Sequence, residues 1–308
     1  MRNITVVGII FYLGLIFATT AYARDITKKN VLTIGRFTDK AQKEQRQFEP
    51  IITFLASKLR DIGIERGEVV LLHDNETVIK NLKEGKLDIV LETPFSAYLY
   101  KAKANATPIL LASRKGVEEY NSYIFVRRDS GISRLEDLKG KVIAFEDICS
   151  TSAYFLPRVS MELEGMDLVR IDSFNSQVPL DKIGYVFAGS ELNISTWVYH
   201  NKVNAGALSS TDWPDQRDNP KAYRNEFEVI YETKKVPRML VMVREGLDEE
   251  LVVRIKEELL NIDKTEEGRN ALKPFKINKF FEPPGGIEGI LKPIDDMLIN
   301  TLAIEELR

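Results

Sequence analysis

Residues 141–157 read KVIAFEDICSTSAYFLP and combine a strand, a short loop and the start of a helix. The run 142–145 is apolar and has the length of a buried strand. Ser150, Thr151 and Ser152 then stand where a helix would begin, and Ser and Thr are favoured at that position. The first amides of a helix have no partner within it, and the helix dipole adds positive potential there. The stretch therefore predicts a β–α unit whose helix start is either simply capped or binds an oxyanion.

Strand-like and helix-like segments alternate on both sides of this stretch. Upstream, four short apolar runs alternate with helical segments. The runs cover residues 31–34, 69–72, 87–91 and 109–112, and the helical segments cover residues 47–60, 76–84 and the stretch after Thr93. The alternation restarts near residue 123. Such a pattern predicts an α/β protein with two lobes, each a mostly parallel sheet covered by helices.

We expect the second lobe to be an insert within the first. Lobe 1 would comprise residues 24–122 plus 244–308, and lobe 2 residues 123–243. Hinge strands near 122–128 and 236–243 would cross between the lobes. Ligands of open α/β sheets bind beyond the carboxyl ends of the strands, so two facing sheets make a cleft that closes on its ligand.

Composition and motifs exclude several classes of protein. The chain has 308 residues and a net charge of −3, which argues against a nucleic-acid binder. Two histidines and one cysteine, Cys149, argue against a transition-metal site and allow no internal disulfide. No Walker A, dinucleotide-binding or nucleophile-elbow motif is present. We therefore expect no enzyme activity, no metal and no cofactor, and the chain offers Cys149 no neighbouring histidine base.

The N-terminus has the order of a secretory signal peptide. Arg2 precedes an apolar run over 4–18, and Ala21-Tyr22-Ala23 is a small-x-small cleavage site. The alternative is a retained membrane anchor. We expect cleavage after Ala23 and a periplasmic protein.

Several segments carry a family resemblance. Residues 141–157 resemble the core motif of phosphate/phosphite/phosphonate-binding proteins of ABC transporters, in which an Ala-Phe strand end precedes an Asp-containing loop and Ser-Thr-Ser-Gly-Tyr-x-x-Pro. Residues 85–89 (GKLDI) and 135–141 (LEDLKGK) match the family in the same order. The likeness spans about residues 31–265 and implies the two-lobed, type 2 periplasmic-binding-protein fold.

The resemblance also implies roles for single residues. Oxyanion oxygens would be held from lobe 2 by the Ser-Thr-Ser run and from lobe 1 by tyrosine and hydroxyl side chains. These residues are Ser150, Thr151, Ser152, Tyr120, Ser122 and Thr93, of which Thr93 is either a further donor or simply the cap of the helix that follows it.

Two positions depart from the family pattern. Asn75 stands at a family tyrosine, and Glu191 at a family histidine. A carboxylate at the second position would repel a dianion, although it could tolerate a protonated ligand oxygen or favour a cationic substituent.

The function expected from these features is capture of a phosphonate, phosphite or phosphate by a monomeric solute-binding protein that serves an ABC permease. One alternative is a sensing module of the same fold that signals to a membrane receptor or histidine kinase. Another is an enzyme built on this fold, which would need a reactive His or Cys at the cleft.

Overall fold

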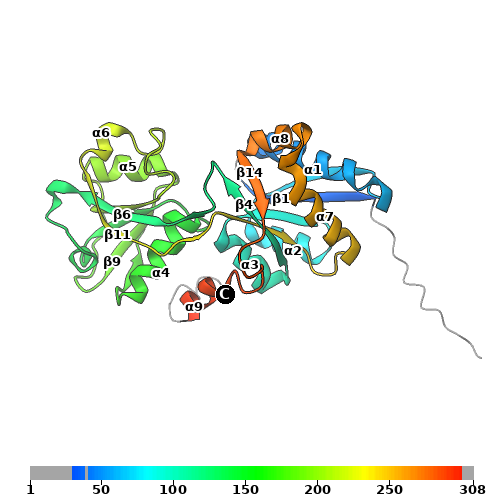
Figure 1. Ribbon diagram of the computed structural model, residues 1–308. Helices are drawn as coiled ribbons and strands as arrows, with labels where there is room; N and C mark the ends of the chain where they lie inside the picture. Colours follow the sequence, from blue (N-terminus) through cyan, green and yellow to red (C-terminus); the bar gives the residue numbers. More distant parts are fainter. Residues whose placement is uncertain (1–29, 39–40, 300–308) are drawn as a thin grey trace, which may run out of the picture.

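Two six-stranded sheets form the centres of two lobes (Figure 1). The computed structural model describes residues 30–38 and 41–299. The predicted signal peptide, residues 1–23, lies outside the described residues. The two-lobed α/β architecture expected from the sequence is confirmed.

Lobe 1 has the strand order β14-β4-β13-β3-β1-β2. Its strands are β1 (Val31–Phe37), β2 (Arg66–Leu72), β3 (Ile89–Glu92), β4 (Thr107–Arg114), β13 (Met239–Val243) and β14 (Ile277–Phe281). The first three strands are parallel, whereas β13 runs antiparallel between β3 and β4. The sheet is therefore mixed, because a strand returning from lobe 2 enters its centre.

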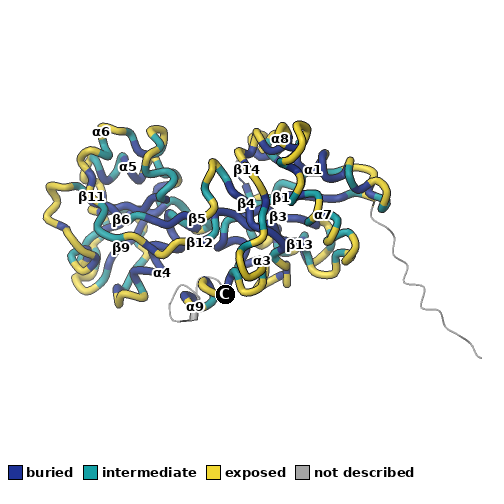
Figure 2. Tube along the Cα trace, in the orientation of Figure 1, coloured by how far each residue is buried: buried dark blue, intermediate teal, exposed yellow. Residues whose placement is uncertain are grey.

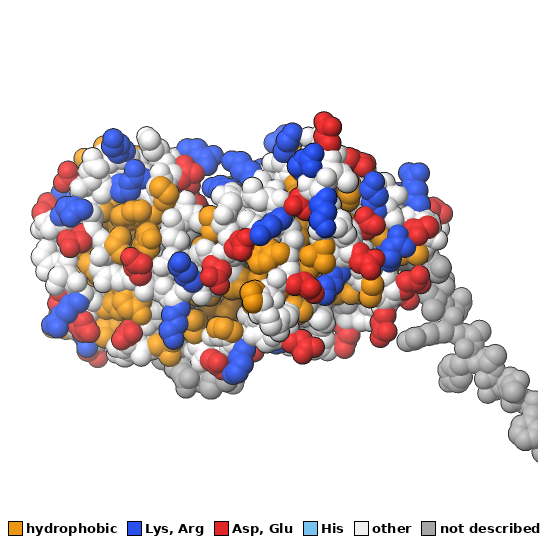
Figure 3. Space-filling model, in the orientation of Figure 1, with side chains coloured by type: hydrophobic (Ala, Val, Ile, Leu, Met, Phe, Trp, Pro, Cys, Tyr) orange, Lys and Arg blue, Asp and Glu red, His pale blue; other side chains and the backbone are white. Residues whose placement is uncertain are grey.

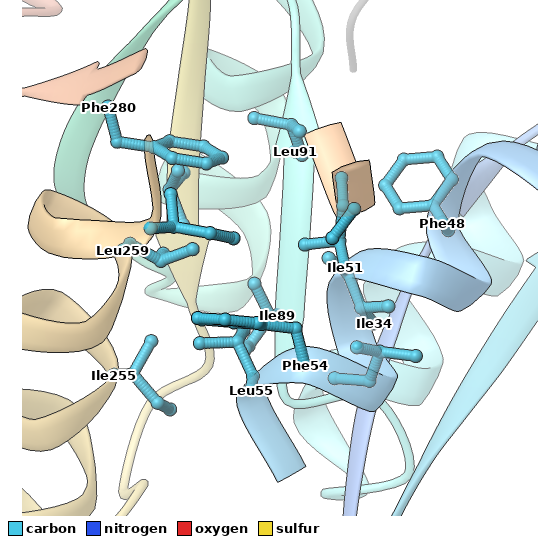
Figure 4. Close-up of a cluster of buried hydrophobic side chains, with 14 of the residues drawn as sticks. Ile34, Phe48, Ile51, Phe54, Leu55, Ile89, Leu91, Ile255, Leu259 and Phe280 are labelled. Atoms are coloured by element: carbon cyan, nitrogen blue, oxygen red, sulfur yellow. The ribbon is translucent and has the colours of Figure 1, made fainter. Parts of the chain in front are cut away.

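Helices α1 and α7 cover one face of this sheet. The helices of lobe 1 are α1 (Ala41–Lys58), α2 (Asn75–Lys83), α3 (Pro94–Ala104), α7 (Glu249–Asn261) and α8 (Glu266–Leu272), with short turns η1 (Arg60–Ile62), η5 (Ile262–Lys264) and η6 (Lys273–Phe275). Phe48 and Leu55 of α1 pack with Leu91 of β3 and Leu259 of α7 (Figure 4). Apolar residues spaced three and four apart give α1 this buried face.

Lobe 2 has the strand order β11-β6-β10-β7-β9-β8. Its strands are β6 (Ser122–Arg127), β7 (Val142–Phe145), β8 (Leu168–Arg170), β9 (Ile183–Phe187), β10 (Ala205–Ser209) and β11 (Phe227–Glu232). Its helices are η4 (Thr151–Phe155), α4 (Leu156–Leu163), α5 (Glu191–Tyr199) and α6 (Lys221–Arg224), with turns η2 (Arg128–Ser130) and η3 (Leu135–Leu138). Strands β7 to β10 are parallel; at one edge β6 runs antiparallel to β10, and β11 runs antiparallel to β6.

A two-stranded ribbon crosses between the lobes. It pairs β5 (Glu119–Tyr120) with β12 (Val236–Pro237), and Figure 2 shows both between the two sheets. The crossing segments are therefore shorter than predicted: β6 belongs to the sheet of lobe 2, and β13 to that of lobe 1. The sheet of lobe 2 accordingly ends at Glu232, not near residue 243. All five residues of β13 are buried, as expected for a central strand.

The lobes also touch through apolar side chains. The ring of Phe155 in lobe 2 stacks on that of Phe95 in α3, with centroids 4.4 Å apart. Helix α9 (Lys292–Ile299) contacts both α3 and α4; its residue Ile294 is buried, as is Leu291 just before the helix. None of the described helices is long and apolar enough to cross a membrane. Acidic and basic side chains intermingle on the face seen in Figure 3.

Candidate functional site

A cavity of about 250 Å³ lies between the lobes. Its lobe 1 wall contains Arg36, Phe37, Thr38, Lys43, Glu44, Glu92, Thr93, Ser96, Arg114, Tyr120 and Arg238. Its lobe 2 wall contains Glu146, Asp147, Cys149, Ser150, Thr151, Ser152, Glu191 and Asp212. A larger open hollow of about 860 Å³ lies on lobe 1 between α1 and α8 and shares only Lys43 with the cavity. The smaller cavity is the candidate site, because the strand ends of both sheets surround it.

The Ser-Thr-Ser run opens a helix as predicted, and that helix begins with a wide π-helical turn. Ser150 is the N-cap, and its hydroxyl accepts a hydrogen bond from the Ala153 amide at 3.1 Å. The Phe155 amide donates to the Ser150 carbonyl at 2.9 Å. The amides of Thr151 and Ser152 donate to no other group in the described part of the chain. Two donors at the helix start are therefore available to a ligand.

The three hydroxyl groups of the Ser-Thr-Ser run differ in the hydrogen bonds that they make to the protein itself. The Thr151 hydroxyl donates to the Thr93 hydroxyl at 2.8 Å and accepts from the Phe95 amide at 3.1 Å. Ser150 is engaged as the cap. The Ser152 carbonyl accepts from the Ser122 hydroxyl at 2.5 Å, while the Ser152 hydroxyl neighbours the Tyr120 phenol. Of the three hydroxyls, that of Ser152 is the best placed for a ligand.

Two of the predicted site residues lie outside the cavity wall. Ser122 is fully buried and supports the backbone of Ser152. Asn75 accepts a hydrogen bond from the Tyr100 phenol at 2.6 Å and donates to the Cys149 sulfur at 3.3 Å. Both residues therefore support residues of the cavity wall, Ser122 through Ser152 and Asn75 through Cys149, without lining the cavity themselves. The remaining predicted residues, Ser150, Thr151, Ser152, Tyr120, Thr93 and Glu191, line the cavity.

Sequence reasoning missed three arginines of the lobe 1 wall. Arg36 forms ion pairs with Glu92 at 3.2 Å and with Glu44 at 3.8 Å. Burial lowers the pKa of Arg36, but Glu92 and Glu44 raise it above its usual value. The Nε of Arg36 is buried and has no hydrogen-bond partner among the described residues.

Arg114 and Arg238 have no carboxylate within ion-pair distance in residues 30–38 and 41–299. The Arg114 Nε donates to the Phe275 carbonyl at 3.2 Å, and Arg238 lies over the Tyr120 ring at 4.5 Å. Burial, then the charges of Arg238 and Arg36, lower the pKa of Arg114 to about 10. A buried cation, Arg238, and a half-buried one, Arg114, thus face the cavity, and neither forms an ion pair with a described carboxylate.

A signal for these arginines was present in the sequence. Arg36 and Arg114 stand at the ends of apolar runs that form β1 and β4. Arg238 immediately precedes β13, and because β13 is antiparallel its start meets the same sheet edge. Arg238 was not expected at this edge, because the sequence predicted residues 236–243 as a hinge strand and not as a strand of the lobe 1 sheet.

The lobe 2 wall is acidic. Burial, then the charges of Glu191 and Asp147, raise the pKa of Glu146 to about 9. The Asp147 carboxylate accepts from the Cys149 amide at 2.7 Å and so orders the loop. The Asp212 carboxylate lies 4.0 Å from the Lys115 amine of lobe 1. The cavity is therefore cationic on one side and acidic on the other.

Comparison with known proteins agrees with this architecture. The structure of XAC2383 from Xanthomonas citri bound to chloride ion is 29% identical, with a TM-score of 0.82 over 87% of this chain and 98% of that chain. The same protein bound to ATP is 28% identical, with a TM-score of 0.81 over 88% and 99%. PhnD1 from Prochlorococcus marinus in complex with methylphosphonate shares the fold at 18% identity, with a TM-score of 0.63 over 87% and 97%.

The family model for the periplasmic phosphonate-binding protein of ABC transporters matches residues 37–283. That range contains the whole sheet of lobe 2, every strand of the lobe 1 sheet except β1, of which it includes only Phe37, and every residue that lines the cavity except Arg36. The resemblance carried by the Ser-Thr-Ser stretch is thereby confirmed. The chain belongs to the family of periplasmic substrate-binding proteins of phosphonate ABC transporters.

Proposed function

We propose that the interlobe cavity captures a small oxyanion of the phosphonate, phosphite or phosphate type and that the protein delivers it to an ABC permease. The observation that carries this proposal is the juxtaposition of Arg114 and Arg238 with the open amides of Thr151 and Ser152. Buried cations without counter-charges are unfavourable alone and are stabilised by an anion. Guanidinium groups also match the oxygens of a phosphonate in pairs.

The size of the cavity favours a small ligand. Pockets for drug-sized molecules usually occupy about 300–1,000 Å³, and this cavity has about 250 Å³. The Xanthomonas citri relative was solved with chloride and with ATP, which are both anions. The present geometry suits an anion much smaller than a nucleotide.

The predicted site residues then divide into two groups. We assign direct contact to the amides of Thr151 and Ser152, the Ser152 hydroxyl and the Tyr120 phenol. Thr93 and Thr151 join the lobes, and Ser150 caps the helix. Asn75 and Ser122 support the wall, and Glu191 faces the ligand from lobe 2.

We propose that the protein is not an enzyme. Burial, then the charge of Asp147, raise the pKa of the Cys149 thiol to about 12. The thiol stays protonated near neutral pH and is a weak nucleophile. Neither His73 nor His200 lines the cavity, and no hydrogen bond among the described residues joins either histidine to Cys149. We further propose that the signal peptide is cleaved after Ala23 and that the periplasmic protein acts as a monomer.

Thermal unfolding with and without candidate ligands tests the binding function. A ligand that binds only the folded state at about 100 times its Kd stabilises it by about 2.7 kcal/mol. We expect methylphosphonate, phosphite or phosphate to raise the Tm by several degrees, and ATP to have a smaller effect. A flat response to all three oxyanions would contradict the proposal. Loss of ligand uptake in cells that lack the protein would then separate transport from sensing.

A further inference from the structure

Two carboxyl groups face the cavity from adjoining loops of lobe 2. Glu146 directly follows β7, and Glu191 is the first residue of α5. The Gly189 amide donates to the Glu146 carbonyl at 2.9 Å, and the Glu146 amide donates to the Ala153 carbonyl at 3.0 Å. Backbone bonds therefore hold the loop of Glu146 against the loop before α5 and against η4. These backbone bonds place the Glu146 and Glu191 side chains on the same wall of the cavity, where the charge of Glu191 acts on the carboxyl group of Glu146.

Two carboxyl groups on one wall of a desolvated cavity are not both ionised cheaply, so one of them keeps a proton. The groups around the pair are mostly acidic on the lobe 2 side and cationic on the facing side. They are Asp147, Ser150, Cys149, Asp212 and Asp218 in lobe 2, and Arg36, Lys43, Glu44, Glu92, Arg114 and Arg238 in lobe 1. One proton on the pair leaves a carboxylic acid beside a carboxylate, so the pair both donates and accepts hydrogen bonds.

Resting on the proposed oxyanion function, we propose that the Glu146–Glu191 pair selects oxyanions that carry a proton over oxyanions that carry none. A hydrogen phosphonate held by Arg114 and Arg238 turns its remaining oxygens toward the acidic wall. Its P–OH group then donates to the carboxylate of the pair.

A sulfonate of the same shape has no such hydrogen. Its oxygens carry only lone pairs, and one of them would lie against the carboxylate in a desolvated site. A buried acceptor facing another acceptor costs the full desolvation of both groups. A site that hydrogen-bonds a ligand hydroxyl strongly rejects an analogue without that hydroxyl. A site that distinguishes ligands by shape alone discriminates much less. Discrimination thus arises from repulsion as well as from attraction.

Methylphosphonate and methanesulfonate make a matched pair of ligands for the test. Calorimetric titration at pH 6, where methylphosphonate retains a proton, should give about 100-fold tighter binding of methylphosphonate. Glu191→Gln should reduce this ratio at least tenfold, since the amide can donate to a sulfonate oxygen. Glu146→Gln should reduce it as well, and the exposed Glu228→Gln is a matched control that should leave it unchanged.

The outcomes separate this inference from the function on which it rests. Equal affinity of the purified protein for both ligands would overturn the selection and leave oxyanion binding intact. A ratio that neither Glu191→Gln nor Glu146→Gln changes would also overturn it. Failure of both ligands to bind would overturn the inference together with the proposed function.

Discussion

The hydroxyl of Thr151 in lobe 2 donates a hydrogen bond of 2.8 Å to the hydroxyl of Thr93 in lobe 1. Thr93 occupies the N-cap of α3 but makes no side-chain bond to its own helix. The cap is supplied instead by Thr151, which accepts from the Phe95 amide. A residue of one lobe thus completes a helix of the other, and the bond forms only when the lobes meet.

Thr151→Val should weaken ligand binding about tenfold, because each lost hydrogen bond contributes about 0.5–1.5 kcal/mol to the joined arrangement of the lobes. The apparent affinity falls with the population of that arrangement. Titration calorimetry with methylphosphonate measures the change. Thr151→Ser keeps the hydroxyl and should bind within about threefold of the original protein. Equal loss in both variants would show that the methyl group, not the hydroxyl, matters.

Arg238→Gln should lower oxyanion affinity by about 10- to 100-fold, since a charge-assisted hydrogen bond contributes about 1.5–3 kcal/mol. Without ligand, the variant should be no less stable than the original protein, because Arg238 has no described ion pair and its positive charge repels that of Arg114. Thermal unfolding with and without methylphosphonate checks both statements. The half-buried Arg254, paired with Asp61 on lobe 1, provides the control Arg254→Gln. Unchanged ligand affinity in Arg238→Gln would remove this residue from the site.

Glu146 should make the ligand-free protein less stable as the pH rises. The pKa of Glu146 is about 9 in the folded state and about 4.5 as a free side chain, so the folded state binds more protons between these values. Stability then decreases with pH across this window. The Tm should fall between pH 5.5 and pH 8.5, and Glu146→Gln should make that fall smaller. The control Glu228→Gln should retain the original slope, and an identical slope in Glu146→Gln would place the proton elsewhere.

The predictable part of the fold came from local patterns. The apolar face over residues 48–59 and the strand–loop–helix unit at 142–157 each settle a local conformation within a few residues. Strand pairing was predicted less well, because β13 joins β3 and β4 across more than 120 residues of chain. Apolar composition identifies a buried strand but not which lobe buries it.

The part of the candidate site that could be predicted is the part formed by one continuous sequence motif. The Ser-Thr-Ser run opens a helix at the cavity, but its sequence cannot show that the Thr151 hydroxyl is occupied by Thr93. Arg114 and Arg238 lie together only because an antiparallel strand brings residue 238 to the end of β4. Such long-range charge clusters depend on topology and not on spacing.

Cys149 should react slowly with thiol reagents. Burial, then the charge of Asp147, raise its pKa to about 12, so its thiolate fraction near neutral pH is on the order of a thousandfold below that of a free cysteine. The rate of iodoacetamide labelling at pH 7.5, compared with that of glutathione, measures this difference. Cys149→Ser should bind methylphosphonate within about threefold of the original protein, because sulfur and oxygen can both accept from the Asn75 amide. Rapid labelling, or loss of a catalytic turnover in Cys149→Ser, would instead assign chemistry to this thiol and contradict a purely binding role.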